Sequence, residues 1–130
     1  MPDPEAPLLL YVEDEVLIQI ALIEGLEEAG YRLLAAKSGA EAFGLLEKHS
    51  AELRGVVTDI NLGKGIDGWE VARTAREAIG GLPVVYVSAA SQQDWTSRGV
   101  PGSVMIAKPF ATDQVVVAIS SLMTASDPPS

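Results

Sequence analysis

The chain alternates between short runs of consecutive apolar residues and longer amphipathic segments. Five apolar runs are bounded by turn residues and have the length of strands that are buried on both faces of a parallel sheet. The predicted strands cover Leu8–Val12, Arg32–Ala36, Gly55–Asp59, Pro83–Ser88 and Ser103–Ala107. Each run precedes a segment with helical periodicity, so the pattern predicts five consecutive βα units.

The segments between these runs carry helix start and stop signals. Ser38 and Glu41 form a capping box for the second predicted helix, and Asp67 and Ser91 are candidate caps for the third and fourth. The predicted helices cover 15–29, the segment after Ser38, 69–79, 91–98 and 112–123. Apolar spacing predicts an inward stripe on the first helix made of Val16, Ile20, Ile23 and Leu26, and one on the last made of Val115, Ile119 and Leu122.

Parallel strands joined by right-handed helical crossovers allow few arrangements. The pattern predicts a three-layer α/β fold of the flavodoxin-like (βα)5 type, with a doubly wound sheet in the order 2-1-3-4-5. Ligands of such sheets bind outside the carboxyl ends of the strands. That rule selects one group of polar residues at the strand ends: Glu13, Asp14, Asp59, Ser88 and Lys108.

The acidic residues of this group have the chemistry of a magnesium site. Mg²⁺ prefers oxygen ligands and is bound in proteins through a few carboxylates together with waters. We expect Asp14 and Asp59 to bind the ion directly, and Glu13 to bind it directly or through water. Asn61 is expected to contribute its backbone carbonyl. Without the cation, three acids in one pocket repel one another and their proton affinities rise.

Asp59 is also the candidate phosphoryl acceptor, because a carboxylate accepts a phosphoryl group as an acyl phosphate once the incoming charge is neutralised. Lys108 is expected to balance the charge on the transferring oxygens. Ser88 is expected to hydrogen-bond a phosphoryl oxygen and to draw its loop inward as a switch. Ala89 is small, which leaves space for a donor or a water molecule to reach Asp59.

The sequences at the strand ends resemble those of a known family. Four motifs are similar to those of bacterial two-component response regulator receiver domains of the CheY-like superfamily: Tyr-Val-Glu13-Asp14-Glu, Val-Val-Thr-Asp59-Ile-Asn61, Tyr-Val-Ser88-Ala-Ala and Ala-Lys108-Pro109-Phe110. The resemblance defines a receiver domain of the stand-alone, single-domain type over residues 7–124, with residues 1–6 and 125–130 as flexible termini. It also implies a cis peptide bond before Pro109.

The resemblance implies a role in phosphoryl transfer between proteins. A sensor histidine kinase or a histidine phosphotransfer protein would be the donor, Mg²⁺ would be the cofactor, and an unidentified downstream protein would read the result by contact. We expect no output domain in this chain and no turnover of an external substrate. The one histidine, His49, is interpreted as a surface residue, so the donor must be another molecule.

Three features depart from the family pattern. Met105 stands where receivers usually carry an aromatic residue whose rotation reports phosphorylation, and methionine has no ring to rotate. The fourth helix is short, and Trp95 within it is either a recognition residue or half-buried packing, whereas Trp69 is interpreted as packing. The glycine-rich loop of residues 63–68 is one residue longer than the family's commonest form.

Composition narrows the range of partners. The formal net charge of −9 argues against nucleic acids and anionic membranes, so we expect protein partners. The chain contains no cysteine, which removes thiol nucleophiles and thiolate metal sites. Its apolar stretches are shorter than a membrane span. These features favour a cytoplasmic protein.

Three other functions are compatible with parts of the sequence. Residues 63–68 spell a GxGxxG motif, but a dinucleotide-binding fingerprint belongs in the first crossover and is followed by an acid that is missing here. A phosphotransferase of the haloacid dehalogenase type also uses a strand-end Asp with magnesium, but it needs a second acid where Asn61 stands. A pseudo-receiver that binds partners without being phosphorylated would keep the fold, and Met105 is the residue that favours it.

Overall fold

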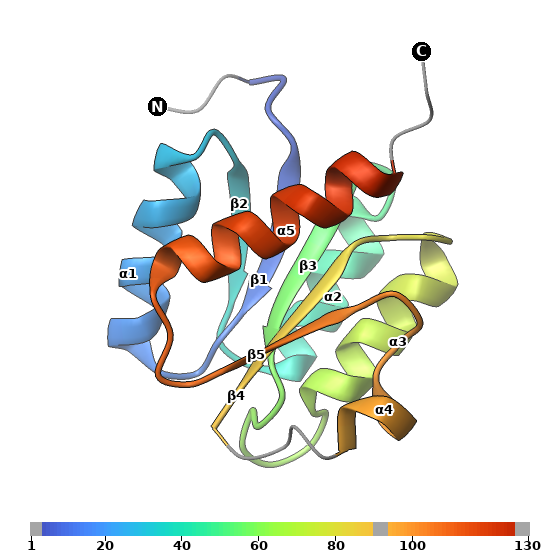
Figure 1. Cartoon of the computed structure of the whole chain (residues 1–130). Helices are drawn as coiled ribbons and strands as arrows, with labels where there is room; N and C mark the ends of the chain where they lie inside the picture. Colours follow the sequence, from blue (N-terminus) through green and yellow to red (C-terminus); the bar gives the residue numbers. More distant parts are fainter. Residues whose placement is uncertain (1–3, 90–93, 127–130) are drawn as a thin grey trace.

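The computed structural model describes residues 4–89 and 94–126 (Figure 1). Its strands are β1 (Leu8–Val12), β2 (Arg32–Ala36), β3 (Leu53–Asp59), β4 (Val84–Ser88) and β5 (Val104–Ala107). Its helices are α1 (Val16–Glu28), α2 (Gly39–His49), α3 (Gly68–Ala78), α4 (Trp95–Arg98) and α5 (Thr112–Ser126). The strands form one parallel sheet in the order β2-β1-β3-β4-β5, which confirms the predicted flavodoxin-like topology.

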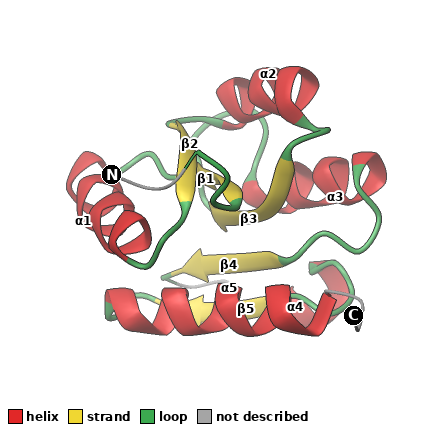
Figure 2. Cartoon of the chain, turned by 90° about the horizontal axis from the view of Figure 1, so that it is seen from above, coloured by secondary structure: helices red, strands yellow, loops and turns green. Residues whose placement is uncertain are grey.

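Helices cover both faces of the sheet (Figure 2). Because side chains alternate along a strand, each face has its own apolar core. One core joins Leu9 and Val57 of the sheet to Leu22 of α1 and Ile119 of α5. The other joins the opposite side of the same strands to α2 and α3, and it contains Trp69, which confirms that this residue serves packing.

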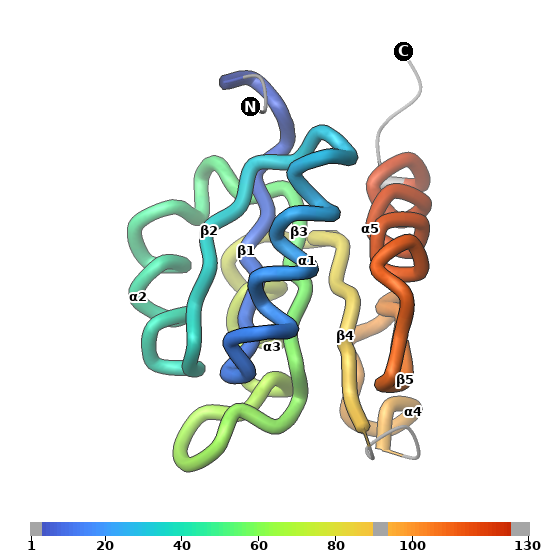
Figure 3. Tube along the Cα trace, turned by 90° about the vertical axis from the view of Figure 1, so that its left-hand side faces the viewer, coloured from blue at the N-terminus to red at the C-terminus, as the bar shows by residue number. Residues whose placement is uncertain are grey.

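The carboxyl ends of the central strands lie together at one end of the molecule. In Figures 1 and 3 the start of β1 and the end of α5 lie at the opposite end. The strand register places Val12 beside Thr58, Asp59 beside Val87, and Ser88 beside Ala107. The loops that follow β1, β3 and β5 therefore begin at nearly the same level.

Local sequence signals start two helices as predicted. Ser38 accepts a hydrogen bond from the Glu41 amide at 3.1 Å, and Asp67 accepts one from the amide three residues later at 2.9 Å. The Glu41 carboxylate accepts from the amide of Lys37 at 3.1 Å, one residue before the position expected in a capping box. The proposed cap Ser91 lies outside the described residues.

The inward stripe predicted for α1 is wrong in its first half. Val16 and Ile20 are 51% and 57% exposed, whereas Leu26 is fully buried and Ile23 packs at the edge of the core. The stripe predicted for α5 is confirmed at its first two positions. That helix continues to Ser126, three residues beyond its predicted end.

A buried polar residue explains the orientation of α1. The side-chain amide of Gln19 donates to the backbone carbonyls of Glu13 at 3.2 Å and Ala36 at 3.1 Å, and so ties the helix to the ends of β1 and β2. These bonds satisfy a buried amide, and they turn the Gln19 side of the helix toward the sheet.

Among the described helices, none combines the length and the apolar character needed to cross a lipid bilayer.

Candidate functional site

Three charged residues from three strand ends meet at the carboxyl edge of the sheet. The Lys108 ammonium lies 2.9 Å from Asp59 Oδ2 and 3.3 Å from Glu13 Oε2. The Glu13 side chain is completely buried, and those of Asp59 and Lys108 are 6% and 12% exposed. The structure therefore brings together three of the five strand-end residues that the sequence grouped into one site.

The charged form of Glu13 is disfavoured in this arrangement. Its burial, together with the negative charge of Asp59, raises the pKa of its carboxyl group to about 7. Its Oε2 accepts hydrogen bonds from Lys108 and from the amide of Glu15 at 3.2 Å. Its Oε1 is buried and, among the described residues, accepts no hydrogen bond of good geometry, although the Lys108 ammonium lies 3.2 Å from it. A buried oxygen of this kind is a natural position for a cation or a water molecule.

Lys108 keeps its charge in the pocket. Burial lowers the pKa of its ammonium group, but the hydrogen bond from Lys108 to Asp59 and the negative charges of Asp59 and Glu13 outweigh that effect. The net result is a pKa above the ordinary value for lysine. The residue therefore remains a cation throughout the physiological pH range.

Four carboxylates form a cluster that could hold a metal ion. One oxygen from each of Glu13, Asp14, Glu15 and Asp59 lies within 4.8 Å of the others. Asp14 and Glu15 are exposed, so an ion can approach from solvent. Asn61 lies beside the cluster, because its backbone amide donates a hydrogen bond to Asp59 Oδ1 at 3.3 Å. Carboxylate oxygens are the donor type that a hard cation such as Mg²⁺ prefers.

The remaining predicted residues lie around this centre. Ser88 ends β4 and is fully buried, and its carbonyl accepts a hydrogen bond from the amide of Lys108 at 2.8 Å. Ala89 follows it on the surface. The peptide bond between Lys108 and Pro109 is cis, as the family resemblance implied.

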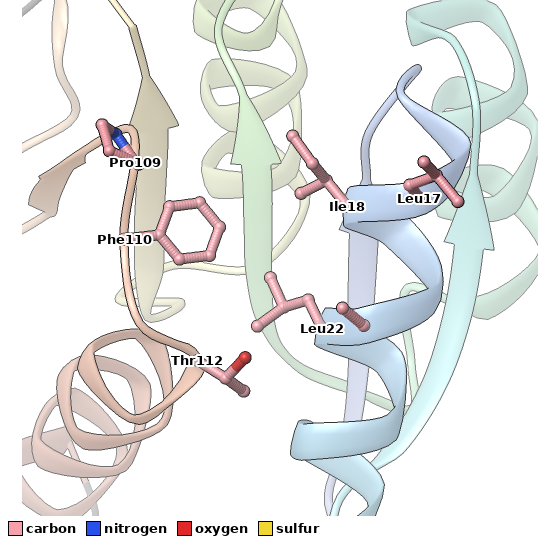
Figure 4. A pocket seen from close by; sticks show the side chains of 7 residues that line it. Leu17, Ile18, Leu22, Pro109, Phe110 and Thr112 are labelled. Atoms are coloured by element: carbon pink, nitrogen blue, oxygen red, sulfur yellow. The ribbon is translucent and has the colours of Figure 1, made fainter.

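An apolar pocket lies next to the site, between α1 and the segment that follows β5. It has a volume of about 280 Å³ and is lined by Leu17, Ile18, Ala21, Leu22, Pro109, Phe110 and Thr112. Figure 4 shows the Phe110 ring pointing across the pocket toward Ile18 and Leu22. The surface of α1 beside the pocket is also apolar, and Leu17 is 83% exposed.

An aromatic residue stands next to the Met105 position, but on the neighbouring strand. Tyr86 pairs with Met105 in the sheet register and is fully buried. Its ring lies 4.8 Å from that of Trp69, and its hydroxyl accepts a hydrogen bond from the Val100 amide at 3.1 Å. Tyr86 thereby connects β4 to the segment that follows α4.

Helix α4 is held by side-chain contacts at its surface. None of its four residues is buried. Arg98 lies 3.4 Å from Asp67 and 5.3 Å above the Trp69 ring. Trp95 is partly exposed and donates from its indole nitrogen to Ser103 at 2.9 Å, so it has a packing role and still presents an open face.

One residue of the site was missed from the sequence. Glu15 Oε1 lies 3.3 Å from the Lys108 ammonium, although no role was assigned to it. The available signal was its place as the third consecutive acid after β1. His49, by contrast, pairs with Glu52 at 2.9 Å at the end of α2, where its side chain is about one-third exposed.

Fold and site together define an α/β protein with an acidic, lysine-containing pocket at the carboxyl edge of its sheet. Residues 9–120 match the response regulator receiver domain family. The chain belongs to this family, as its four motifs indicated.

Solved structures agree with this assignment. The response regulator receiver protein from Sinorhizobium medicae superimposes with a TM-score of 0.91 at 38% sequence identity, covering 96% of this chain and 100% of that one. The receiver domain of the hybrid histidine kinase CckA superimposes with a TM-score of 0.74 at 24% identity, covering 89% and 98% of the two chains. The latter comparison supports the fold alone.

Curated relatives contain the same region within longer proteins. The transcriptional regulatory protein PdtaR of Mycobacterium tuberculosis is 34% identical over 116 residues, which is 85% of this chain and 54% of PdtaR. The sensor kinase CckA of Brucella abortus is 26% identical over 122 residues, which is 92% of this chain and 13% of that protein. The chain therefore spans about half of the regulator and a small part of the kinase.

Proposed function

We propose that the protein is a phosphoacceptor in a two-component or phosphorelay pathway and is phosphorylated on Asp59. A sensor histidine kinase or a histidine phosphotransfer protein donates the phosphoryl group, and a downstream protein reads the modified state through contact. The observation that carries the proposal is the Lys108 ammonium, which lies 2.9 Å from the buried Asp59 carboxylate inside a cluster of acids. Membership of the receiver family supports the same conclusion.

The transfer involves a single covalent step on the protein. A carboxylate oxygen of Asp59 forms a bond to phosphorus while the bond from phosphorus to the donor imidazole nitrogen breaks. The nitrogen keeps the electron pair of that bond, and Asp59 becomes an acyl phosphate. Lys108, already beside Asp59 Oδ2, donates to a phosphoryl oxygen and offsets its charge.

Mg²⁺ fits the acidic cluster, because four carboxylates converge there and the buried Glu13 Oε1 accepts no hydrogen bond of good geometry from the described residues. Asp14 and Asp59 would hold the ion directly, Glu13 would hold it directly or through water, and Asn61 would add its backbone carbonyl. When bound, the ion supplies positive charge for the phosphoryl oxygens. The protein's own contribution is to hold these oxygens close together before the ion arrives.

The response to phosphorylation is assigned to the end of β4. Ser88 would donate its hydroxyl to a phosphoryl oxygen and draw the chain after β4 toward Asp59. Ala89 is exposed and carries only a methyl group, which leaves room for the donor and later for the water that hydrolyses the acyl phosphate. No external substrate is turned over in this cycle.

The apolar surface beside the site is assigned to the donor protein. Leu17 is 83% exposed, and it lines the pocket that α1 forms with Phe110. Apolar side chains exposed next to a charged reaction centre are typical of protein-binding surfaces. A donor bound there would hold its phosphohistidine close to Asp59.

Phosphoryl transfer from a small acyl phosphate tests the proposal directly. The protein is incubated with Mg²⁺ and acetyl phosphate, and intact-mass spectrometry follows the addition of one phosphoryl group. We expect labelling of the wild type, none of Asp59→Asn, and none when EDTA removes the metal. An unlabelled wild type, or equal labelling of Asp59→Asn, would overturn the proposal. Turnover of a small phosphoester would instead favour a phosphotransferase.

A further inference from the structure

Glu15 belongs to the acidic cluster, but the proposed chemistry gives it no role as a metal ligand or in phosphoryl transfer. Its side chain is 60% exposed, and its Oε1 lies 3.3 Å from the Lys108 ammonium. We propose that Glu15 is a positioning residue that holds Lys108 at the mouth of the pocket, and that Lys108 releases Glu15 when a phosphoryl group reaches Asp59. The inference rests on the function proposed above.

The position of Glu15 at the start of α1 indicates that its side chain binds Lys108 and does not cap the helix. Glu15 is the N-cap residue of α1, with an extended backbone, but its carboxylate makes no capping hydrogen bond. A cap side chain normally accepts from a free amide of the first helical turn. The caps of α2 and α3, Ser38 and Asp67, both do so. Glu15 leaves its own helix uncapped and contacts Lys108 instead.

The hydrogen-bonding capacity of Lys108 requires one partner to be released. An ammonium group has three donors. In this structure Lys108 donates to Asp59 at 2.9 Å, to Glu13 at 3.3 Å and to Glu15 at 3.3 Å. All three donors are therefore in use. A phosphoryl oxygen gains a hydrogen bond from Lys108 only when one of these carboxylates loses its own.

Differences in burial identify which carboxylate is released. Glu13 is completely buried, so the loss of Lys108 would take a compensating cation away from a carboxylate in the interior. Asp59 carries the phosphoryl group itself. Glu15 is exposed, and water replaces Lys108 there at little cost, because ion pairs at the surface contribute little to stability. Glu15 is therefore the partner that Lys108 exchanges.

Substitution of Glu15 by glutamine tests this role. Glu15→Gln keeps the size of the side chain and removes its charge. We expect the rate of labelling by acetyl phosphate with Mg²⁺ to rise by about two- to five-fold, the range that an exposed ion pair provides. The gain should shrink as salt is raised, because salt screens exposed charges. The matched control Glu28→Gln, at the far end of α1, should label at the wild-type rate.

A double-mutant cycle shows whether Glu15 acts through Lys108. In a Lys108→Met background, Glu15→Gln should leave the remaining labelling rate unchanged. An equal acceleration in that background would mean that Glu15 simply repels the anionic donor, and it would overturn the inference. An unchanged or slower rate of Glu15→Gln in the wild-type background would overturn it as well.

A measurement without a phosphoryl donor separates this inference from the proposed function. NMR of the lysine ammonium groups in the unmodified protein reports how fast the Lys108 hydrogens exchange with water. We expect faster exchange in Glu15→Gln and no change in Glu28→Gln. Unchanged exchange in Glu15→Gln would overturn the role of Glu15, whereas only a failure to label wild-type Asp59 would overturn the function.

Discussion

Lys108 is one ammonium group among four carboxylates. The degree of burial decides how strongly the charged form of each acid is disfavoured. Asp14 and Glu15 are exposed to solvent. Glu13 is completely buried, next to Asp59, so its charge is opposed by both desolvation and repulsion. In the absence of a metal, the protonation of Glu13 therefore changes near neutral pH.

The raised pKa of Glu13 predicts that the metal-free protein loses stability as the pH rises. The carboxyl group has a pKa of about 7 in the folded protein, against an ordinary value of 4.5. The folded state binds this proton more tightly than the unfolded state, so the free energy of unfolding falls between about pH 4.5 and pH 7. Lys108 keeps its proton across this interval because its pKa is raised.

Urea unfolding in EDTA measures this effect. We expect the wild type to be less stable near pH 8 than near pH 5, by at most about 3 kcal/mol, which is the energy equivalent of the pKa shift. Glu13→Gln should reduce the slope, because glutamine does not titrate. Glu28→Gln should keep it. A stability that rises over this interval in the wild type would contradict the prediction.

At the scale of elements, the sequence predicted those features of the helices that depend on residues close together in the chain. Ser38 and Asp67 cap their helices because the cap and the amide it binds are three residues apart. The orientation of α1 could not be predicted in the same way. Residues 16–23 are apolar except for Gln19, so periodicity gave no unique inward face. The partners that orient Gln19 are backbone carbonyls at the ends of two strands, which only the fold brings together.

The aromatic neighbour of Met105 is a second contact between distant residues that the sequence alone could not predict. Tyr86 and Ser88 are two residues apart on β4 and therefore point to the same face of the sheet. The Tyr86 hydroxyl accepts a hydrogen bond from the Val100 amide, which links the carboxyl-terminal part of β4 to the segment that follows α4. Sequence alone showed that Met105 lacks a ring. Only the register of β4 and β5 showed that Tyr86 lies beside it.

Arg98 should control the attachment of α4. The helix buries no residue, and Arg98 joins it to Asp67 and to the Trp69 ring. We expect Arg98→Ala to cost about 1 kcal/mol locally, from an exposed ion pair and a cation–π contact. Hydrogen exchange of the amides in residues 95–100 should become faster, with little change in the melting temperature.

Arg73→Ala is the matched control, because Arg73 is an exposed arginine on α3. Its amide exchange around α4 should equal that of the wild type. If Arg98→Ala leaves the exchange of residues 95–100 unchanged, the helix is held by other contacts. A large loss of global stability would show that Arg98 supports the core.

At the scale of the whole molecule, topology explains why the site was predictable. A parallel sheet places every strand's carboxyl end at one edge, and right-handed crossovers leave few strand orders. Glu13, Asp59 and Lys108 were therefore grouped correctly although they lie far apart in sequence. Their distances, the burial of Glu13 and the contact with Glu15 depend on side-chain packing, which the strand pattern does not specify.

The same geometry predicts that Mg²⁺ stabilises the whole protein. The folded state gathers four carboxylates within 4.8 Å, and the unfolded chain does not, so the ion binds the folded state selectively. At ten times its dissociation constant, such a ligand adds about 1.4 kcal/mol to the free energy of unfolding. The gain should be larger near pH 8 than near pH 5, because the ion competes with the proton on Glu13.

Calorimetric melting with and without Mg²⁺ measures this gain, and two controls identify its origin. The chain carries a net charge of −9, so any salt relieves repulsion to some degree, and NaCl at equal ionic strength gives the size of that general effect. Asp14→Asn removes a proposed ligand from the exposed side of the cluster and should abolish the specific part. An equal shift with NaCl, or a full Mg²⁺ response in Asp14→Asn, would show that the acids share a surface charge effect and do not form a metal site.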